Sequence, residues 1–187
     1  MTRQQMTVFT LRRFAAMLAL WGLTTGAVLA GSVDVSRFVG TYEGSAEVQT
    51  STGQTAQRDL SVKISETDRG FVAAWSTTTY RSDGASKEKS YEIEFVPSDR
   101  SGIFAAAMTR NVFGHAVQHD PMKGEPYVWS RISGDTLTVF SLFVNEEGGY
   151  ELQQFDRTLT DGGLMLEFHA LRNGQKERQI TSFLKRQ

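Results

Sequence analysis

The sequence predicts an all-β protein: a single antiparallel up-and-down barrel of about 8–10 strands, with a β-sandwich as the alternative. Short segments with alternating apolar and polar residues recur after residue 30, and compact turns rich in Gly, Asp, Asn and Ser separate them. No segment has a clear helical period. A closed barrel has no free edge strands, which suits a chain of 187 residues without a cysteine.

Residues 1–30 have the pattern of a secretory signal peptide. An uncharged, largely apolar stretch ends there in small residues, and three arginines precede it: Arg3, Arg12 and Arg13. This pattern predicts cleavage before Gly31, by the general or the twin-arginine route. An uncleaved anchor is the alternative, but about 17 apolar residues are at the lower limit for spanning a bilayer. We therefore expect a β-barrel domain of residues 31–187, periplasmic or secreted, with no stable membrane anchor.

The composition excludes several classes of function. The full chain has 20 basic and 21 acidic residues, so losing three arginines leaves a mildly acidic domain without a basic stripe. Nucleic acid is therefore not an expected partner, and no protein partner can be named. The sequence contains no nucleophile elbow, zinc-protease motif, glycine-rich phosphate loop or cysteine nucleophile. We expect a protein that is not an enzyme and holds no cofactor.

The first half of the domain contains five predicted strands. In the first, residues 38–50, Tyr42 and its neighbours at every second position share one face, and Gly40 and Gly44 allow that strand to bend. Turn residues at 51–53, 68–70 and 82–84 separate the following runs. The remaining predicted strands of this half are 60–64, 71–80, 91–95 and 102–109.

The second half is built around residues 126–160. Three apolar runs are separated there by turns at Gly134-Asp135 and at residues 146–149, which predicts three antiparallel strands. Both faces of the middle run are apolar, so we expect this strand to be covered on both sides. Two further strands, residues 164–171 and 179–185, flank a turn that contains Asn173-Gly174.

Residues 33–43, VDVSRFVGTYE, resemble the opening motif of lipocalins and related calycins. Asp34, Phe38 and Gly40 occupy the family's Asp, aromatic and Gly positions, and Tyr42 stands where the family has tryptophan. The resemblance implies a ligand-binding barrel whose floor is closed by the first strand.

One further lipocalin feature has candidates in this chain, and two others are missing. In lipocalins a basic residue near the last strand stacks on the floor aromatic, and Arg178 and Lys185 are the two candidates here. The second lipocalin motif and the long helix before the last strand have no counterpart. The predicted number of about ten strands is closer to that of the fatty-acid-binding barrels than to the eight strands of lipocalins.

Aromatic side chains predict a binding site. Tyr127, Trp129 and Arg131 share one face of a strand, and the arginine could pair with a ligand's acidic end. We predict a binding or carrier barrel for a small apolar or amphipathic ligand. The alternative is an envelope accessory or structural protein with a filled barrel that acts through its loops. The candidate ligand-binding residues are Tyr42, Trp75, Tyr91, Tyr127, Trp129 and Arg131.

Two of the three histidines are candidate metal ligands. His115, His119 and Asp120 share a long loop with the spacing H-x-x-x-H-D, which could supply two imidazoles and a carboxylate to zinc or copper. The loop has no third histidine, so solvated side chains are the favoured interpretation. His169 alternates with apolar residues and is expected on the outside. We therefore expect no metal site.

Overall fold

The structure is a computed structural model that describes residues 34–49, 55–81, 83–110 and 116–187. Ten strands form a closed antiparallel barrel, which confirms the predicted fold class. Each strand pairs with its neighbours along the chain, and β1 pairs with β12. The barrel strands are β1 (Gly40–Gln49), β2 (Thr55–Thr67), β3 (Gly70–Tyr80), β4 (Ser86–Pro97), β5 (Ile103–Ala106), β8 (Tyr127–Ser133), β9 (Thr136–Val144), β10 (Tyr150–Thr160), β11 (Gly163–Arg172) and β12 (Gln175–Arg186).

Smaller elements complete the chain. A two-stranded sheet of β6 (Thr109–Arg110) and β7 (Ala116–Val117) and two 3-10 helices, η1 (Ser36–Phe38) and η2 (Pro121–Lys123), lie outside the barrel strands. The part of the chain that the structure describes has no helix long and apolar enough to cross a membrane. Residues 1–30 lie outside the described ranges, so their role as a signal peptide stays a prediction.

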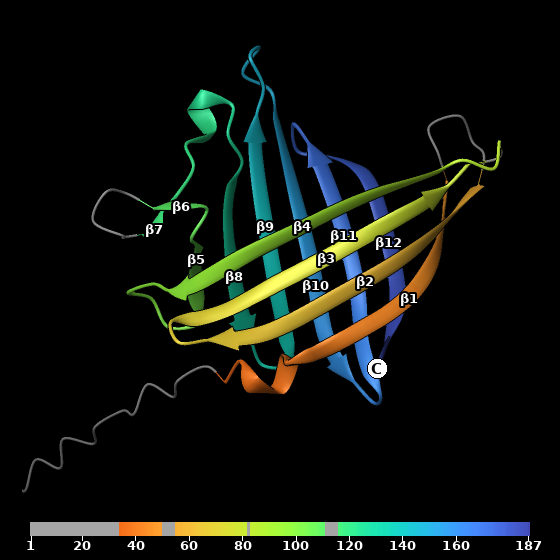
Figure 1. Ribbon diagram of the computed structural model, residues 1–187. Coiled ribbons are helices and arrows are strands. Elements are labelled where there is room, and N and C mark those ends of the chain that lie inside the picture. The colour runs from red at the N-terminus through yellow and green to blue at the C-terminus, as the bar shows by residue number, and fades with distance from the viewer. Residues whose placement is uncertain (1–33, 50–54, 82, 111–115) are drawn as a thin grey trace, which may run out of the picture. The chain divides into compact units, whose positions relative to one another are not determined.

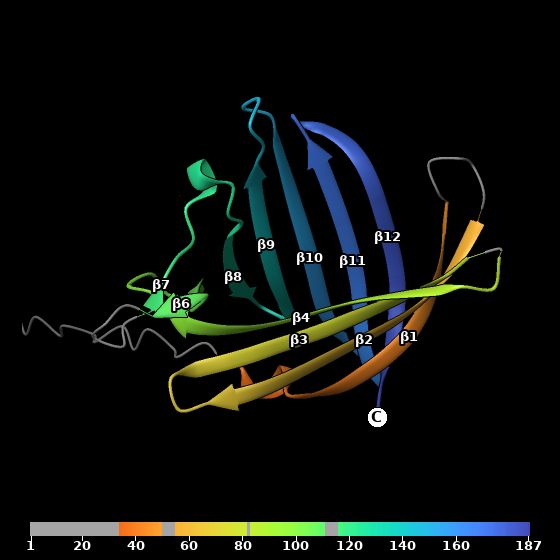
Figure 2. The same ribbon diagram turned by 45° about the horizontal axis from the view of Figure 1, so that its top comes forward.

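The barrel has two walls that close tightly at one end only. Strands β1–β4 run across strands β8–β12 (Figures 1 and 2). The walls are joined by short seams: β1 and β12 share two residue pairs, β4 and β5 share three, and β5 and β8 share three. By contrast, β2 and β3 pair over their whole overlap, from Arg58 with Thr79 to Thr67 with Gly70. The seams define the closed floor, and the other end of the barrel is splayed.

The floor is packed with fully buried aromatic and aliphatic side chains. Phe71 stacks on Phe95 with ring centroids 5.1 Å apart and meets the edge of Phe104 at the same distance. The inward residues of the strands follow a two-residue period, which brings aromatic and aliphatic side chains from several strands into the same layer. The other members of this layer are Phe38, Tyr42, Ile64, Leu137, Leu164 and Leu184. The floor half of the barrel is therefore solid.

The β1–β12 seam depends on Gly44. A Cβ at that position would lie 2.4 Å from the Phe183 carbonyl oxygen and 2.8 Å from a Leu184 methyl carbon. The glycine thus permits the close approach of two backbones. This role differs from the predicted one, which was to let the first strand bend.

Tyr42 lies at the same seam, fully buried in the floor. Its hydroxyl donates a hydrogen bond of 2.9 Å to the Phe38 carbonyl. The cation above its ring is Arg186, whose guanidinium carbon is 5.5 Å from the ring centroid and which also donates to the Val39 carbonyl. A cation therefore lies over the Tyr42 ring, but it is neither Arg178 nor Lys185. Both predictions were wrong: Arg178 lies over the Phe168 ring instead, and Lys185 shares the outward face of β12 with the exposed Phe183.

Candidate functional site

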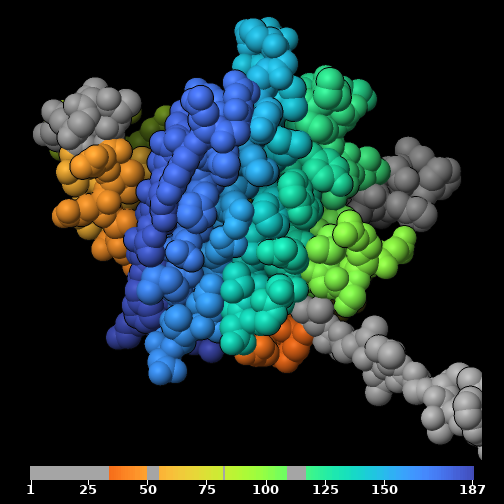
Figure 3. Space-filling view, turned by 180° about the vertical axis from the view of Figure 1, so that it is seen from behind, coloured from red at the N-terminus to blue at the C-terminus, as the bar shows by residue number. Residues whose placement is uncertain are grey.

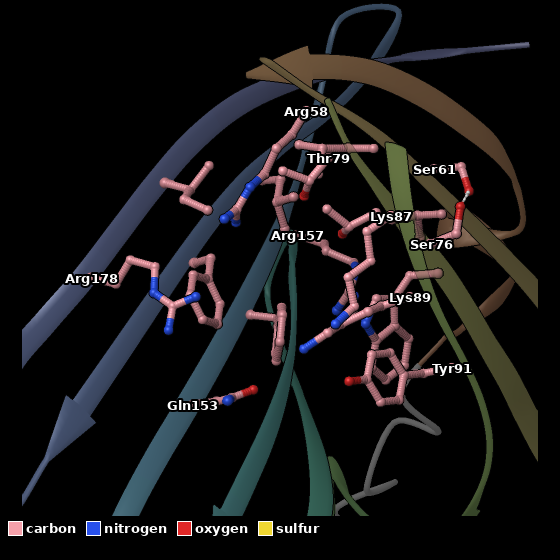
Figure 4. Close-up of a pocket in the computed structure, with 18 residues that line it drawn as sticks. Arg58, Ser61, Ser76, Thr79, Lys87, Lys89, Tyr91, Gln153, Arg157 and Arg178 are labelled. Atoms are coloured by element: carbon pink, nitrogen blue, oxygen red, sulfur yellow. Dashed lines mark hydrogen bonds between the residues drawn. The ribbon is translucent and has the colours of Figure 1, made fainter. Parts of the chain in front are cut away.

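A cavity of about 200 Å³ lies between the two walls of the barrel, above the floor (Figure 4). Strands β2, β3 and β4 line one side, and β10, β11 and β12 line the other. Its size is below the roughly 300–1,000 Å³ of pockets that enclose a drug-sized molecule, so it fits a small ligand or one part of a longer one. The apolar lining residues are Leu60, Val62, Trp75, Tyr91, Phe155, Leu166, Phe168 and Ile180.

Aromatic rings from both walls contact one another along this cavity. Trp75 and Tyr91 are cross-strand neighbours whose rings stack at 5.4 Å, and Phe155 packs against Phe168 at 4.7 Å on the facing wall. Trp75 and Phe155 meet across the barrel with centroids 5.7 Å apart. Such a layer offers flat, rigid apolar surface to a ligand.

The polar lining of the cavity is cationic. Five basic side chains line it, and none of its lining residues is an aspartate or a glutamate. Figure 4 shows these side chains extending into the pocket. The basic residues are Arg58, Lys87, Lys89, Arg157 and Arg178. A cavity with this lining attracts anions and repels cations.

Arg157 is the deepest of the five. Only 1% of its surface is exposed, and its guanidinium carbon lies 5.3 Å from the Trp75 ring centroid and 5.6 Å from that of Phe155. Within the described part of the chain, its Nε and Nη1 are buried without a hydrogen-bond partner. Burial lowers the pKa of Arg157 to about 10, against the opposing effect of Asp156. The guanidinium therefore keeps its charge at neutral pH but has no carboxylate bound to it.

Asp156 does not neutralise Arg157 by contact. It lies on the alternate face of β10, where its carboxylate accepts hydrogen bonds of 2.6 Å from Thr138 and from Gln154. The buried cation thus lacks the hydrogen-bonded counter-ion that usually accompanies such a group.

The remaining four cations surround the splayed end of the cavity. Burial, and then the repulsion of Arg178, lowers the pKa of Arg58, whose buried Nε has no partner among the residues described. Arg178 lies over the Phe168 ring at 5.9 Å. The nearby carboxylate of Glu151 is held by Gln153 and Arg172, at 2.6 and 3.1 Å, and these contacts lower its pKa. The rim therefore keeps a local excess of positive charge.

The structure brings only part of the predicted site together. Trp75 and Tyr91 line the cavity, as their alternation predicted. Tyr42 does not: it is buried in the floor beneath it.

Tyr127, Trp129 and Arg131 do share a face, but that face is the outer one. The inward positions of β8 belong to the buried Val128, Ser130 and Ile132, whose smaller side chains fit the packed floor half. Trp129 instead stacks on Phe140 at 4.8 Å, and Arg131 lies over the same ring at 5.9 Å. Figure 3 shows the outer face of strands β8–β12, over which the described part of the chain places no second sheet. On that face of β9 Thr138 is nearly fully buried, whereas Phe140 and Leu142 are partly exposed, so the expected covering of both faces holds only in part.

Sequence reasoning missed the cations that line the cavity. The signal was present, because the face that carries Tyr91 continues through Lys89 to Lys87, and Phe155 is followed two residues later by Arg157. These charges were not singled out as inward from the sequence, because long basic side chains are rarely buried.

The loop histidines gain no structural support as a metal site. His115 lies outside the described residues. Asp120 caps η2 by accepting a hydrogen bond of 3.0 Å from the Met122 amide. No group of three His, Cys, Asp or Glu side chains that could hold a metal occurs in the described ranges.

The fold and the cavity define a class: a small up-and-down β-barrel, solid at the floor and hollow above it, with an aromatic and cationic interior. No family model and no curated protein matches the chain. It is similar to a solved structure of a "putative AttH" from Nitrosomonas europaea, with 8% identity over 84% of this chain and 55% of that one and a TM-score of 0.24. The chain thus spans about half of that protein's length, and a likeness at this level carries no argument.

Proposed function

We propose that this protein is an exported binding or carrier barrel for a small amphipathic ligand that has an anionic group. The observation that carries the proposal is the lining of the cavity, which combines an aromatic layer with five basic and no acidic side chains. Aromatic surface binds the apolar part of such a ligand, and guanidinium and ammonium groups bind its acidic part. No catalytic constellation accompanies these residues, so binding is the activity that the site supports.

The experiment uses two fluorescent probes that differ mainly in charge. Anilinonaphthalene sulfonate is an anion, and N-phenylnaphthylamine is its neutral counterpart. We expect the purified protein to bind the sulfonate at least about tenfold more tightly, which corresponds to about 1.4 kcal/mol and is typical of one charge-assisted hydrogen bond. Equal affinity for the two probes, or no binding of either, would contradict the proposal.

The two tryptophans of the described residues supply a matched control. Trp75 lies in the cavity, whereas Trp129 lies on the outer face of β8. Trp75→Ala should weaken sulfonate binding severalfold, and Trp129→Ala should leave it unchanged. Urea unfolding of both variants separates a loss of binding from a loss of the fold.

A second candidate is an envelope accessory protein that acts through contacts with another protein. The outer face of β8 and β9 favours it, because Tyr127 is exposed there beside the partly exposed Trp129 and Phe140, and exposed apolar patches often mark interaction surfaces. The probe experiment separates the two functions. A protein that binds neither probe, but loses its binding to another envelope protein when Trp129 is replaced, would fit the accessory function.

A further inference from the structure

The cations of the cavity lie in two separate layers. On β10 the inward residues from the floor upward are Arg157, Phe155 and Gln153, and Gln153 pairs with Ala170, which pairs in turn with Arg178. The two guanidinium groups thus belong to rows four residues apart, a rise of about 13 Å along the strand. The aromatic layer lies between them.

The facing wall repeats this order. Trp75 and Tyr91 form the aromatic row, and the row nearest the splayed end joins Arg58 through Thr79 to Lys87. Lys89 lies between these two rows. Both walls therefore place aromatic rings in the middle and positive charge at the rim. Of the five cations that line the cavity, Arg157 alone lies beneath the rings, on the floor side.

Contacts with the rings link the two layers. Arg178 lies over Phe168, Phe168 packs on Phe155, and Phe155 lies over Arg157. Each layer also has a buried guanidinium nitrogen with no partner in the described ranges: Nε and Nη1 of Arg157 below, and Nε of Arg58 above. A single anionic group bound to one layer would leave the other layer unsatisfied.

We propose that the ligand is an elongated apolar or aromatic dianion, with one acidic group bound by Arg157 and a second one held among Arg58, Arg178 and the rim lysines. This inference rests on the proposed function and specifies its ligand class. The apolar middle of the ligand lies against the aromatic layer. Its two acidic ends lie in the cationic layers on either side of the rings, whose rows are about 13 Å apart along the strand. The deep group enters first, because the cavity is splayed only at the rim end.

The test uses two matched acids. The para,para′-biphenyl dicarboxylate has a carboxylate at each end of a rigid apolar spacer, and para-biphenyl monocarboxylate has only one. We expect the dicarboxylate to bind at least about tenfold more tightly by isothermal titration calorimetry, because the second charge-assisted contact is made only by the dianion.

Three variants assign the contacts to the layers. Arg157→Leu should weaken binding of both acids, whereas Arg178→Leu should weaken the dicarboxylate about tenfold and leave the monocarboxylate within about twofold. Arg131→Leu, on the outer face, is the control and should change neither affinity. Circular dichroism of each variant confirms that it is folded.

The outcomes separate the two proposals. Similar affinities for the two acids, or an Arg178→Leu variant that binds the dicarboxylate normally, would overturn the dianion inference while the proposed function stands. If the protein binds neither acid and also fails to bind the sulfonate probe, both proposals fall. If it binds the sulfonate but neither acid, only the dianion inference falls.

Discussion

Replacing Arg157 by methionine should leave the protein as stable as before, or more stable, while it removes anion binding. The reason is that this guanidinium is fully buried without a carboxylate in contact. An arginine kept for structure would behave in the opposite way, because breaking a buried ion pair typically costs about 3–5 kcal/mol.

The magnitude follows from the pKa of Arg157. Burial lowers it well below its ordinary value, to about 10, which corresponds to about 3 kcal/mol of unfavourable free energy for the charged form. The variant loses favourable contacts with the Trp75 and Phe155 rings, worth roughly 2 kcal/mol together, but the methionine sulfur regains part of this against the same rings. The expected change in the free energy of unfolding is therefore between zero and about 2 kcal/mol of stabilisation.

Urea unfolding followed by far-ultraviolet circular dichroism measures this change without relying on Trp75 fluorescence. Arg131→Met, on the outer face, is the matched control and should have little effect on either stability or binding. A variant at position 157 that loses more than about 2 kcal/mol of stability and still binds the sulfonate probe would refute the reasoning, because the arginine would then be structural.

Three further predictions follow from the fold and the cavity. Gly44→Val should destabilise the protein by about 1–3 kcal/mol in urea unfolding because the seam strands would be forced apart, whereas Thr41→Val should be nearly neutral. Arg157→Lys should make sulfonate binding weaken as pH rises from about 7 towards 10, because burial lowers a lysine pKa below its usual value of about 10.4, whereas the wild-type arginine stays charged to about 10. N-terminal sequencing of periplasmic protein should find Gly31 first.

Each of these predictions has a result that would contradict it. Equal and small changes in the free energy of unfolding for Gly44→Val and Thr41→Val would show that the β1–β12 seam tolerates a side chain. A lysine variant with the same pH profile as the wild type would mean that position 157 is wetter than its burial indicates. Exported protein that keeps Met1 would show that the first 30 residues are not cleaved.

The barrel was predictable because its signal is spread over many residues. Alternation such as Tyr91, Ile93 and Phe95 assigns a face within one strand, and turn residues mark the strand ends. Strand number and fold class then follow from counting such segments. The inward faces predicted for Trp75 and Tyr91 agree with their place in the cavity lining for the same reason.

The site was less predictable because alternation does not say which face is inside. The stretch containing Trp129 alternates aromatic residues with small and aliphatic ones, and the smaller set faces the packed floor. Alternation also does not show how far along the barrel axis a residue lies from the floor. Whether Arg157 is buried or solvated depends on the register of β10 against β9 and β11, which pairs it with Leu137 and Leu166. That register is a tertiary property.

The short seam between β1 and β12 also has a consequence for the order in which the chain can fold. The pairs of Tyr42 with Arg186 and of Glu43 with Lys185 join the two strands, with one further backbone hydrogen bond from the Gln187 amide to the Thr41 carbonyl and one from the Ser182 hydroxyl to the Ser45 carbonyl. These contacts unite residues that are far apart in the sequence. Because synthesis proceeds from the N-terminus, β1 has no partner on that side until β12 has been made. Closure is thus a late, non-local event of high contact order, and loss of the last three residues should leave a long-lived open sheet with an unpaired edge.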